Sequence, residues 1–126
     1  MFGEHQVYAT LPAADLERAK TWYRDKLGLS PAGDMPGAAY YNMGGGSGFL
    51  LFATQFGGTA QNTAMGIRSS DMDADVAALR AKGVVIEEYD LPGLKTVNGI
   101  ADMGGFRSAW FKDSEGNTLG ISDGMG

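Results

Sequence analysis

The sequence predicts an α+β domain with two copies of one unit, in which a strand and a helix are followed by three further strands. Residues 6–31 show the first copy: an alternating strand, an Asp where a helix starts and a Gly where it ends. Residues 64–88 repeat this order. The length of 126 residues suits one compact domain rather than two. We therefore expect a single domain over 1–126, with a first module at about 5–56 and a second at about 62–124.

In the first module, residues 7–11 alternate between apolar and other side chains, which predicts a strand. Asp15 is placed to cap the helix that follows, and Gly28 to end it in a left-handed conformation. A hairpin is expected over 38–54, with glycines in its turn. The predicted apolar face of the helix consists of Leu16, Ala19, Tyr23 and Leu27.

In the second module, Asp71 is the expected helix cap and Gly83 the expected helix end. A strand is predicted to begin at 84–86, and a hairpin is predicted over 108–122, with its turn at 113–116. The predicted apolar face of this helix consists of Met72, Val76 and Leu79.

The segment 91–107 between these elements is glycine-rich and is expected to lack regular structure. A loop of this length in a compact domain favours a functional role. One interpretation is a lid that closes over a binding site through Tyr89, Leu94 and Lys95; the other is a connector or a contact in a dimer.

Composition excludes several chemistries. The chain has no Cys and a single His, His5, so it forms no disulfide, no Cys-ligated zinc site, no iron–sulfur cluster and no three-histidine metal site within one subunit. A net charge of −5 argues against nucleic acid or an anionic membrane as a partner. No apolar run approaches the length of a membrane span, and no signal peptide is evident, so a cytoplasmic location is expected.

Two segments carry a resemblance to a known family: LPAADLERAKTWYRDKLGL in the first module and AWFKDSEGNTLGIS in the second. They resemble the entry helix and the closing hairpin of the vicinal oxygen chelate superfamily, which includes glyoxalase I, extradiol dioxygenases and bleomycin-resistance proteins. The resemblance covers nearly the whole chain. It implies that the two βαβββ modules pair into a U-shaped mixed sheet with a concave cleft that holds the site, and that the protein forms a homodimer.

Enzymes of this superfamily usually hold a divalent metal through four side chains, two from each module. The resemblance places these positions at Tyr8, Leu50, Ala64 and Gly120. Three of them have no donor side chain, and a neutral tyrosine is a poor lone ligand. We therefore expect no metal, no other cofactor and no catalytic residue of the superfamily's metal-dependent type.

Strand alternation in the same register predicts which side chains face the cleft. Ala64, Gly66 and Gly120 are expected on its floor, whereas Met65 and Ile67 are expected to face the helices. Aromatic walls over a floor of small residues favour a flat, largely apolar ligand; the alternative is that these aromatics are ordinary core. The predicted ligand-binding residues are Tyr8, Thr10, Tyr40, Leu50, Phe52, Arg68, Ser108, Trp110 and Thr118.

The favoured function is a non-catalytic protein that binds a small apolar or aromatic molecule, as the antibiotic-sequestering members of the superfamily do. One alternative is a metal-free isomerase or lyase that uses Tyr8 or Arg68. A glyoxalase- or dioxygenase-like metalloenzyme is the alternative if the register is shifted. A dimeric partner module without a ligand is the third. Binding is favoured because no carboxylate falls in the predicted cleft.

Overall fold

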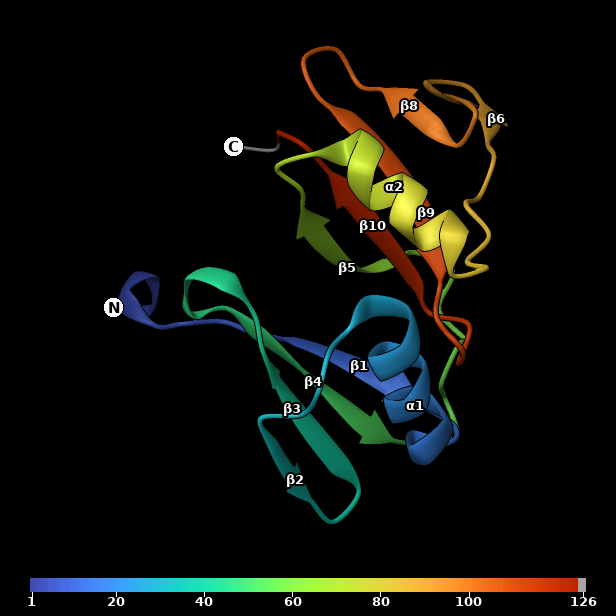
Figure 1. Ribbon diagram of the computed structural model, residues 1–126. Coiled ribbons are helices and arrows are strands. Elements are labelled where there is room, and N and C mark those ends of the chain that lie inside the picture. Colours follow the sequence, from blue (N-terminus) through green and yellow to red (C-terminus); the bar gives the residue numbers. More distant parts are fainter. Residues whose placement is uncertain (125–126) are drawn as a thin grey trace.

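The first module forms a four-stranded mixed sheet with one helix (Figure 1). The computed structural model describes residues 1–124, so the end of the predicted domain, 125–126, lies outside the described residues. In the sheet order β1-β4-β3-β2, β1 runs parallel to β4 and the other pairs are antiparallel. The elements are β1 (Ala9–Ala13), α1 (Leu16–Leu27), β2 (Gly33–Met35), β3 (Ala38–Asn42) and β4 (Gly48–Ala53), with short 3-10 turns at Phe2–Glu4 and Gly44–Gly46.

The second module forms a six-stranded mixed sheet in the order β5-β10-β9-β8-β7-β6, in which β5 runs parallel to β10. Its elements are β5 (Thr63–Arg68), α2 (Met72–Ala81), β6 (Asp90–Leu91), β7 (Leu94–Val97), β8 (Ile100–Asp102), β9 (Arg107–Lys112) and β10 (Thr118–Ser122). The predicted α+β class is confirmed, because the fold consists of two mixed sheets and the helices α1 and α2.

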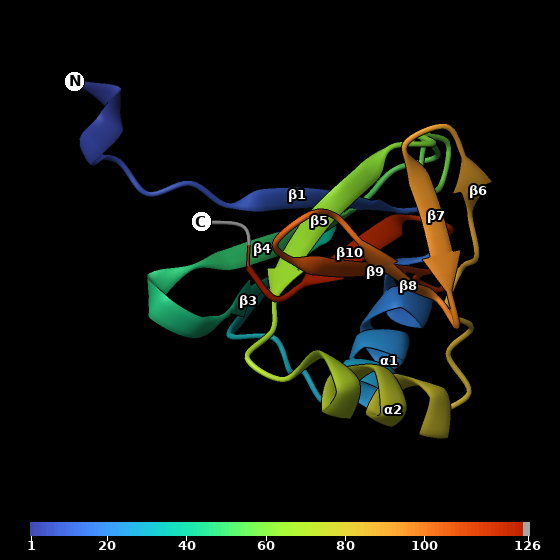
Figure 2. The same ribbon diagram turned by 90° about the horizontal axis from the view of Figure 1, so that it is seen from above.

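Both helices lie on the same side of the two sheets (Figure 2). Between helices and sheets lies one core, to which both modules contribute buried side chains. Tyr23 of α1 packs against Tyr41 and Phe49, whose rings stack with centroids 4.6 Å apart. Trp22 of the same helix stacks on Phe111 of β9, so α1 contacts the second module as well as its own.

The predicted helix caps are confirmed. The Asp15 carboxylate accepts a hydrogen bond from the backbone N–H of Arg18 at 3.0 Å, and Gly28 ends the helix with φ 69°. Asp71 caps α2 by accepting from Ala74 N at 3.1 Å. The predicted apolar faces are buried at Ala19 and Tyr23 of α1 and at Met72, Val76 and Leu79 of α2.

Two strand predictions are corrected. The first strand runs from Ala9 to Ala13 rather than over 7–11, because its pairing with β4 begins at Ala9 and continues to Ala53. The strand expected at 84–86 is reduced to a single bridge between Ile86 and Phe111.

The expectation of an irregular segment over 91–107 is wrong. It contains β7, β8 and part of β6, which extend the second sheet. The signal was the dipeptide Asn98-Gly99, which has φ 52° and 81°. Two successive positive φ values are typical of a type I′ hairpin turn, so the chain reverses there and pairs with itself.

The two modules are fixed together by the turn at 113–117, which docks against the start of α1. The Glu115 carboxylate, fully buried, accepts from Asp15 N at 2.8 Å and from Arg18 Nε and Nη2 at 2.9 and 3.0 Å. Asn117 donates from Nδ2 to the carbonyl of Pro12 at 2.8 Å. The Tyr23 hydroxyl donates to Asp113 Oδ2 at 2.7 Å, so the turn is bonded to both β1 and α1.

The linker between the modules passes very close to this turn at Gly58, where a Cβ would collide with the carbonyl oxygen of Glu115. We expect Gly58→Ala to lower the free energy of unfolding by about 1–3 kcal/mol more than Gly93→Ala. Gly93 is a matched control because it has φ +79°, against +75° at Gly58, and open space around its Cα. Urea denaturation of both variants measures the difference; equal losses would contradict this packing.

Burial of Glu115 raises the pKa of its carboxyl, but the hydrogen bonds from Arg18, Asp15 N and Ser114 outweigh this and lower it to about 2. A depressed pKa stabilises the fold above the unfolded-state pKa of about 4.3, and this stability is lost as the pH falls toward 2. We expect Glu115→Gln to cost about 3 kcal/mol at pH 7 and progressively less below pH 4. Urea titrations at several pH values test this, with Glu17→Gln, an exposed residue, as the control that shows no such convergence.

Candidate functional site

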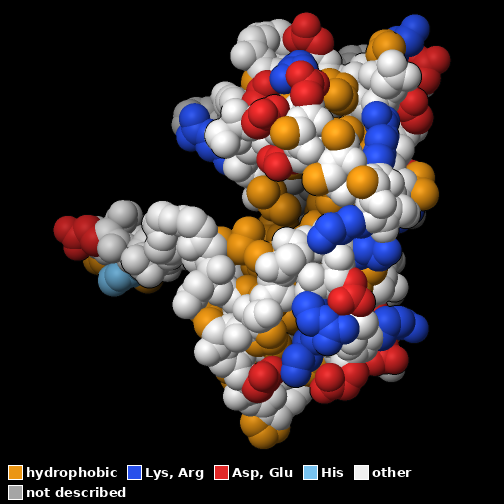
Figure 3. Space-filling model, in the orientation of Figure 1, with side chains coloured by type: hydrophobic (Ala, Val, Ile, Leu, Met, Phe, Trp, Pro, Cys, Tyr) orange, Lys and Arg blue, Asp and Glu red, His pale blue; other side chains and the backbone are white. Residues whose placement is uncertain are grey.

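The modules diverge at the end opposite to the docked turn and leave a cleft between them. Residues around the start of β1 and the β3–β4 turn form one wall, and β5 with the loop after it forms the other. The cleft has a volume of about 800 Å³, within the range of small-molecule sites. Figure 3 shows it as a hollow between the two halves of the molecule, with hydrophobic side chains inside.

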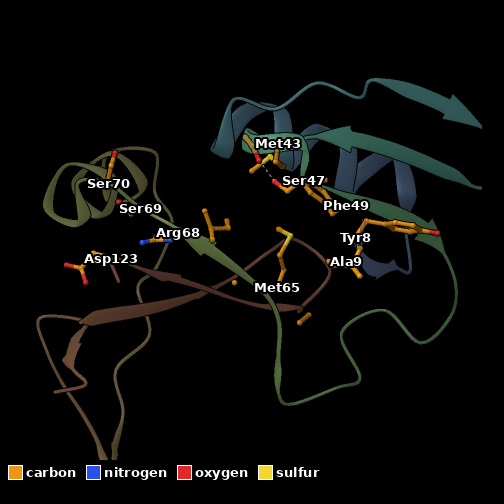
Figure 4. A pocket seen from close by; sticks show the side chains of 16 residues that line it. Tyr8, Ala9, Met43, Ser47, Phe49, Met65, Arg68, Ser69, Ser70 and Asp123 are labelled. Carbon is orange, nitrogen blue, oxygen red and sulfur yellow. Dashed lines mark hydrogen bonds between the residues drawn. The ribbon is translucent and has the colours of Figure 1, made fainter. Parts of the chain in front are cut away.

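Apolar and polar side chains both line the cleft (Figure 4). Met65 of β5 and, from the first module, Ala9, Met43 and Phe49 lie around the opening between the modules (Figure 4), and Ile67 of β5 also lines it. The polar side chains of the lining include Ser47, Arg68, Ser69, Ser70 and Asp123.

The carboxylate of Asp123, which lines the cleft, is hydrogen-bonded to a neighbouring residue of the same chain. It accepts from the backbone N–H of Arg107 at 2.7 Å and from Arg107 Nε at 3.1 Å. These contacts lower the pKa of Asp123, and the backbone hydrogen bond from Arg107 has the largest effect. Arg107 also binds Asp73 at 3.1 Å, so the Asp123 carboxylate stays ionised and anchored near neutral pH and is poorly suited to donate a proton.

An aromatic surface adjoins the cleft at Tyr8. The Tyr8 and Tyr40 rings meet edge to face, with centroids 6.2 Å apart, and the Tyr8 side chain is 58% exposed. Leu50 and Phe52 of β4 are half-buried. These four side chains, which we call the aromatic face, leave apolar surface available next to the cleft.

On the second module the corresponding surface is filled by its own side chains. The Trp110 indole lies over Gly120, where a Cβ would come within 3.3 Å of Nε1. The Tyr89 ring meets Trp110 edge to face at 5.6 Å. Ser108 and Thr118 are buried, with 7% of each exposed.

Comparison with known proteins identifies the family. The model of the Glyoxalase/Bleomycin resistance protein/Dioxygenase superfamily matches residues 5–121. The chain belongs to this superfamily. The resemblance seen in the two sequence motifs is thereby confirmed. A search of the curated proteins gave no significant match.

Several solved structures share the fold. UcmS2 superposes with a TM-score of 0.75 at 17% identity, covering 95% of this chain and 98% of that one. TnmS3, an antibiotic binding protein from Streptomyces sp. CB03234, gives 0.69 at 23% identity, with 97% of each chain covered. Lactoylglutathione lyase from Agrobacterium tumefaciens also gives 0.69, at 22% identity, covering 96% and 94%.

The residues at the superfamily's metal positions do not fit a divalent ion. Tyr8, Leu50, Ala64 and Gly120 provide one phenol and no carboxylate or imidazole. The indole of Trp110 takes the space beside Gly120 that a longer side chain would need. Within residues 1–124, no three His, Asp or Glu side chains come together in a group able to hold a metal ion.

The structure distributes the predicted site residues over three places. Tyr8 and Arg68 line the cleft. Tyr40, Leu50 and Phe52 belong to the aromatic face, and Thr10 is exposed on the neighbouring strand β1. Ser108, Trp110 and Thr118 lie on the filled surface of the second module. Their role in ligand binding stays a prediction.

Sequence reasoning missed the interior of the cleft. Met65 and Ile67 were expected to face only the helices, and they also line the opening between the modules. Alternation assigned them correctly to the opposite strand face from Ala64 and Gly66. Strand alternation contains no information about the divergence of the two modules. This divergence exposes the strand face that carries Met65 and Ile67.

The indole over Gly120 generates a prediction. We expect Gly120→Val to displace Trp110 and to destabilise the fold by about 1–3 kcal/mol through overpacking. Gly66→Val is the matched control, because Gly66 pairs with Gly120 on the adjacent strand and has nothing within 4 Å of its Cβ position. Near-ultraviolet circular dichroism and urea denaturation measure both effects. An unchanged aromatic signal in Gly120→Val would contradict the placement of the ring.

Proposed function

We propose that this protein binds a small, largely apolar or aromatic organic molecule without a metal ion, in the cleft between its modules and against the adjoining aromatic face. The observation that carries the proposal is a hollow of about 800 Å³ between the modules, whose lining includes Met43, Met65 and Ile67, next to the exposed ring of Tyr8. A flat ligand would insert between Met65 and Met43 and extend over Tyr8 and Tyr40.

Sequestration is favoured over catalysis by the chemistry of the lining. The only carboxylate among the described lining residues is Asp123, which Arg107 holds in its ionised form. A general acid or base needs a group that exchanges a proton near neutral pH. Superfamily membership, together with the likeness to the antibiotic binding protein TnmS3, supports a ligand of the antibiotic class.

The free energy of binding requires that both the cleft and the aromatic face contact the ligand. Burying about 200 Å² of apolar ligand surface contributes about 5 kcal/mol. Association costs about 4–15 kcal/mol in lost translational and rotational freedom. Contact with the aromatic face alone is therefore insufficient for tight binding, and the cleft interior must contribute.

We expect Tyr8→Ala to weaken binding of daunorubicin, a flat polycyclic aromatic antibiotic, and of 8-anilinonaphthalene-1-sulfonate by about 5- to 30-fold. This corresponds to about 1–2 kcal/mol of lost aromatic contact. Phe56→Ala is the matched control, since Phe56 is 62% exposed, against 58% for Tyr8, and does not line the cleft. Fluorescence titration gives both affinities.

Three results would contradict the proposal: no binding of either probe by the unaltered protein, equal losses in the two variants, or a rise in melting temperature on adding Mn²⁺, Ni²⁺ or Zn²⁺. Chemical conversion of the bound antibiotic, followed by mass spectrometry, would favour the metal-free enzyme.

We propose a homodimer as the working state, in line with the resemblance, and a cytoplasmic location. No helix within residues 1–124 combines the length and apolar character of a membrane crossing.

A further inference from the structure

A second cavity lies between α1 and α2, on the helix-covered side of the two sheets (Figure 2). We call it the interhelical pocket, and its volume is about 270 Å³. Most of its lining is apolar and comes from both modules. The buried residues of the lining are Leu79, Phe111 and Ile121, and the half-buried apolar ones are Leu27, Leu29, Met43 and Ile67. The pocket therefore opens onto the edge of the shared core.

The small side chain of Ala78 keeps the α2 side of the pocket open. Ala78 is exposed and lies on the same helix face as Asp75 and Lys82, three residues before it and four after it, which also line the pocket. Sites for drug-sized molecules usually measure about 300–1,000 Å³, so this pocket is at the lower limit of that range. Its size favours a slender ligand over a wide ring system.

One end of the pocket is cationic. Lys26 of α1 and Lys82 at the end of α2 both line it, and Lys26 Nζ donates to the carbonyl oxygen of Lys82 at 2.6 Å. An ammonium group has three donors, and this hydrogen bond uses one of them. Asp25, the acidic neighbour of Lys26 in the sequence, is paired with Arg24 at 2.9 Å. Two lysine side chains therefore meet the apolar lining at this end.

The acidic residue of the lining lies away from the lysines. Asp75 precedes Lys82 by seven residues, which in a helix is about 10 Å along the axis. The Asp75 carboxylate accepts a hydrogen bond from the hydroxyl of Ser69, in the loop before α2. The positive and negative charges of the lining are therefore at different ends of the pocket.

We propose that the interhelical pocket binds a free carboxylic acid with a short or medium alkyl chain. The carboxylate lies against Lys26 and Lys82, where charge-assisted hydrogen bonds orient it. The chain lies over Leu79 and Phe111, where burial of its methylene groups supplies the affinity. This site is distinct from the cleft, so it does not rest on the function proposed above.

The pair Ala78→Leu and Ala77→Leu tests the pocket with octanoate as the probe. Both alanines are exposed residues of α2, and only Ala78 lines the pocket. Because alanine and leucine both favour helix, neither change should unfold α2. We expect Ala78→Leu to fill the pocket and to raise the Kd of octanoate at least about 10-fold, against less than about 2-fold for Ala77→Leu. Titration followed by NMR of isotope-labelled protein measures both, and equal Kd values would overturn the proposal.

A series of ligands tests the chemical class. From pentanoate to octanoate, the affinity should rise about 4-fold for each added methylene, as expected for about 0.8 kcal/mol per buried CH₂. Octylamine, which has the opposite charge, should bind at least about 10-fold more weakly than octanoate. An affinity that is independent of chain length, or equal for the two head groups, would overturn the proposed class.

The lysine end is tested by Lys82→Gln, with Lys95→Gln as an exposed control outside the pocket. The side chain of Lys82 is exposed, and its hydrogen bond with Lys26 uses the backbone carbonyl, so the substitution keeps that bond. We expect Lys82→Gln to weaken octanoate binding about 3- to 5-fold and the control to leave it unchanged. Equal affinities in the two variants would overturn the placement of the carboxylate.

The NMR signals that shift on titration separate this site from the cleft. Binding in the pocket should shift the amide signals of Ala78 and Leu79, whereas shifts confined to Tyr8 and Ser47, which line the cleft, would overturn the proposal. Binding of octanoate in the pocket without binding of daunorubicin would contradict the proposed function alone. Binding of daunorubicin without octanoate would overturn only the pocket.

Discussion

The docking of the turn at 113–117 onto the start of α1 is the contact on which the rest of the molecule depends. The two sheets share no hydrogen-bonded ladder within residues 1–124, so strand pairing does not set their relative orientation. The buried Glu115 carboxylate and the Asn117 amide do so, by satisfying donors and acceptors at the junction of β1 and α1. A buried charge is tolerated here because the Arg18 guanidinium, the Asp15 N–H and the Ser114 hydroxyl donate hydrogen bonds to it.

Fixing the modules at one end leaves the other end open. This explains why apolar residues of β5, which would be interior in a closed sheet, line a hollow. It also places the hollow beside the start of β1, so that Val7, Tyr8 and Ala9 line it. The Trp110 ring over Gly120 fills this face of the second module, whereas on the first module the ring of Tyr8 stays exposed beside the cleft.

Local signals in the sequence predicted the local structure well. Asp15 and Asp71 begin the helices because a short carboxylate satisfies free amides wherever a helix starts, whatever the tertiary context. The Asn98-Gly99 turn was equally readable, since its positive φ values are a local property, but the strands on either side are only three or four residues long. Strands this short carry too little alternation to stand out from a loop.

The sequence by itself determined the repeat, the helix ends, the class of fold, the family resemblance and the lack of a donor side chain at three of the four positions that the resemblance assigns to the metal. All of these follow from residue type and spacing along the chain. Only the tertiary structure decided which strand face lines the opening between the modules, that Trp110 fills the space above Gly120, and that the Tyr8 ring lies exposed beside the cleft. These features depend on the angle between two modules, and that angle is set by contacts between residues about a hundred positions apart, which no local pattern encodes.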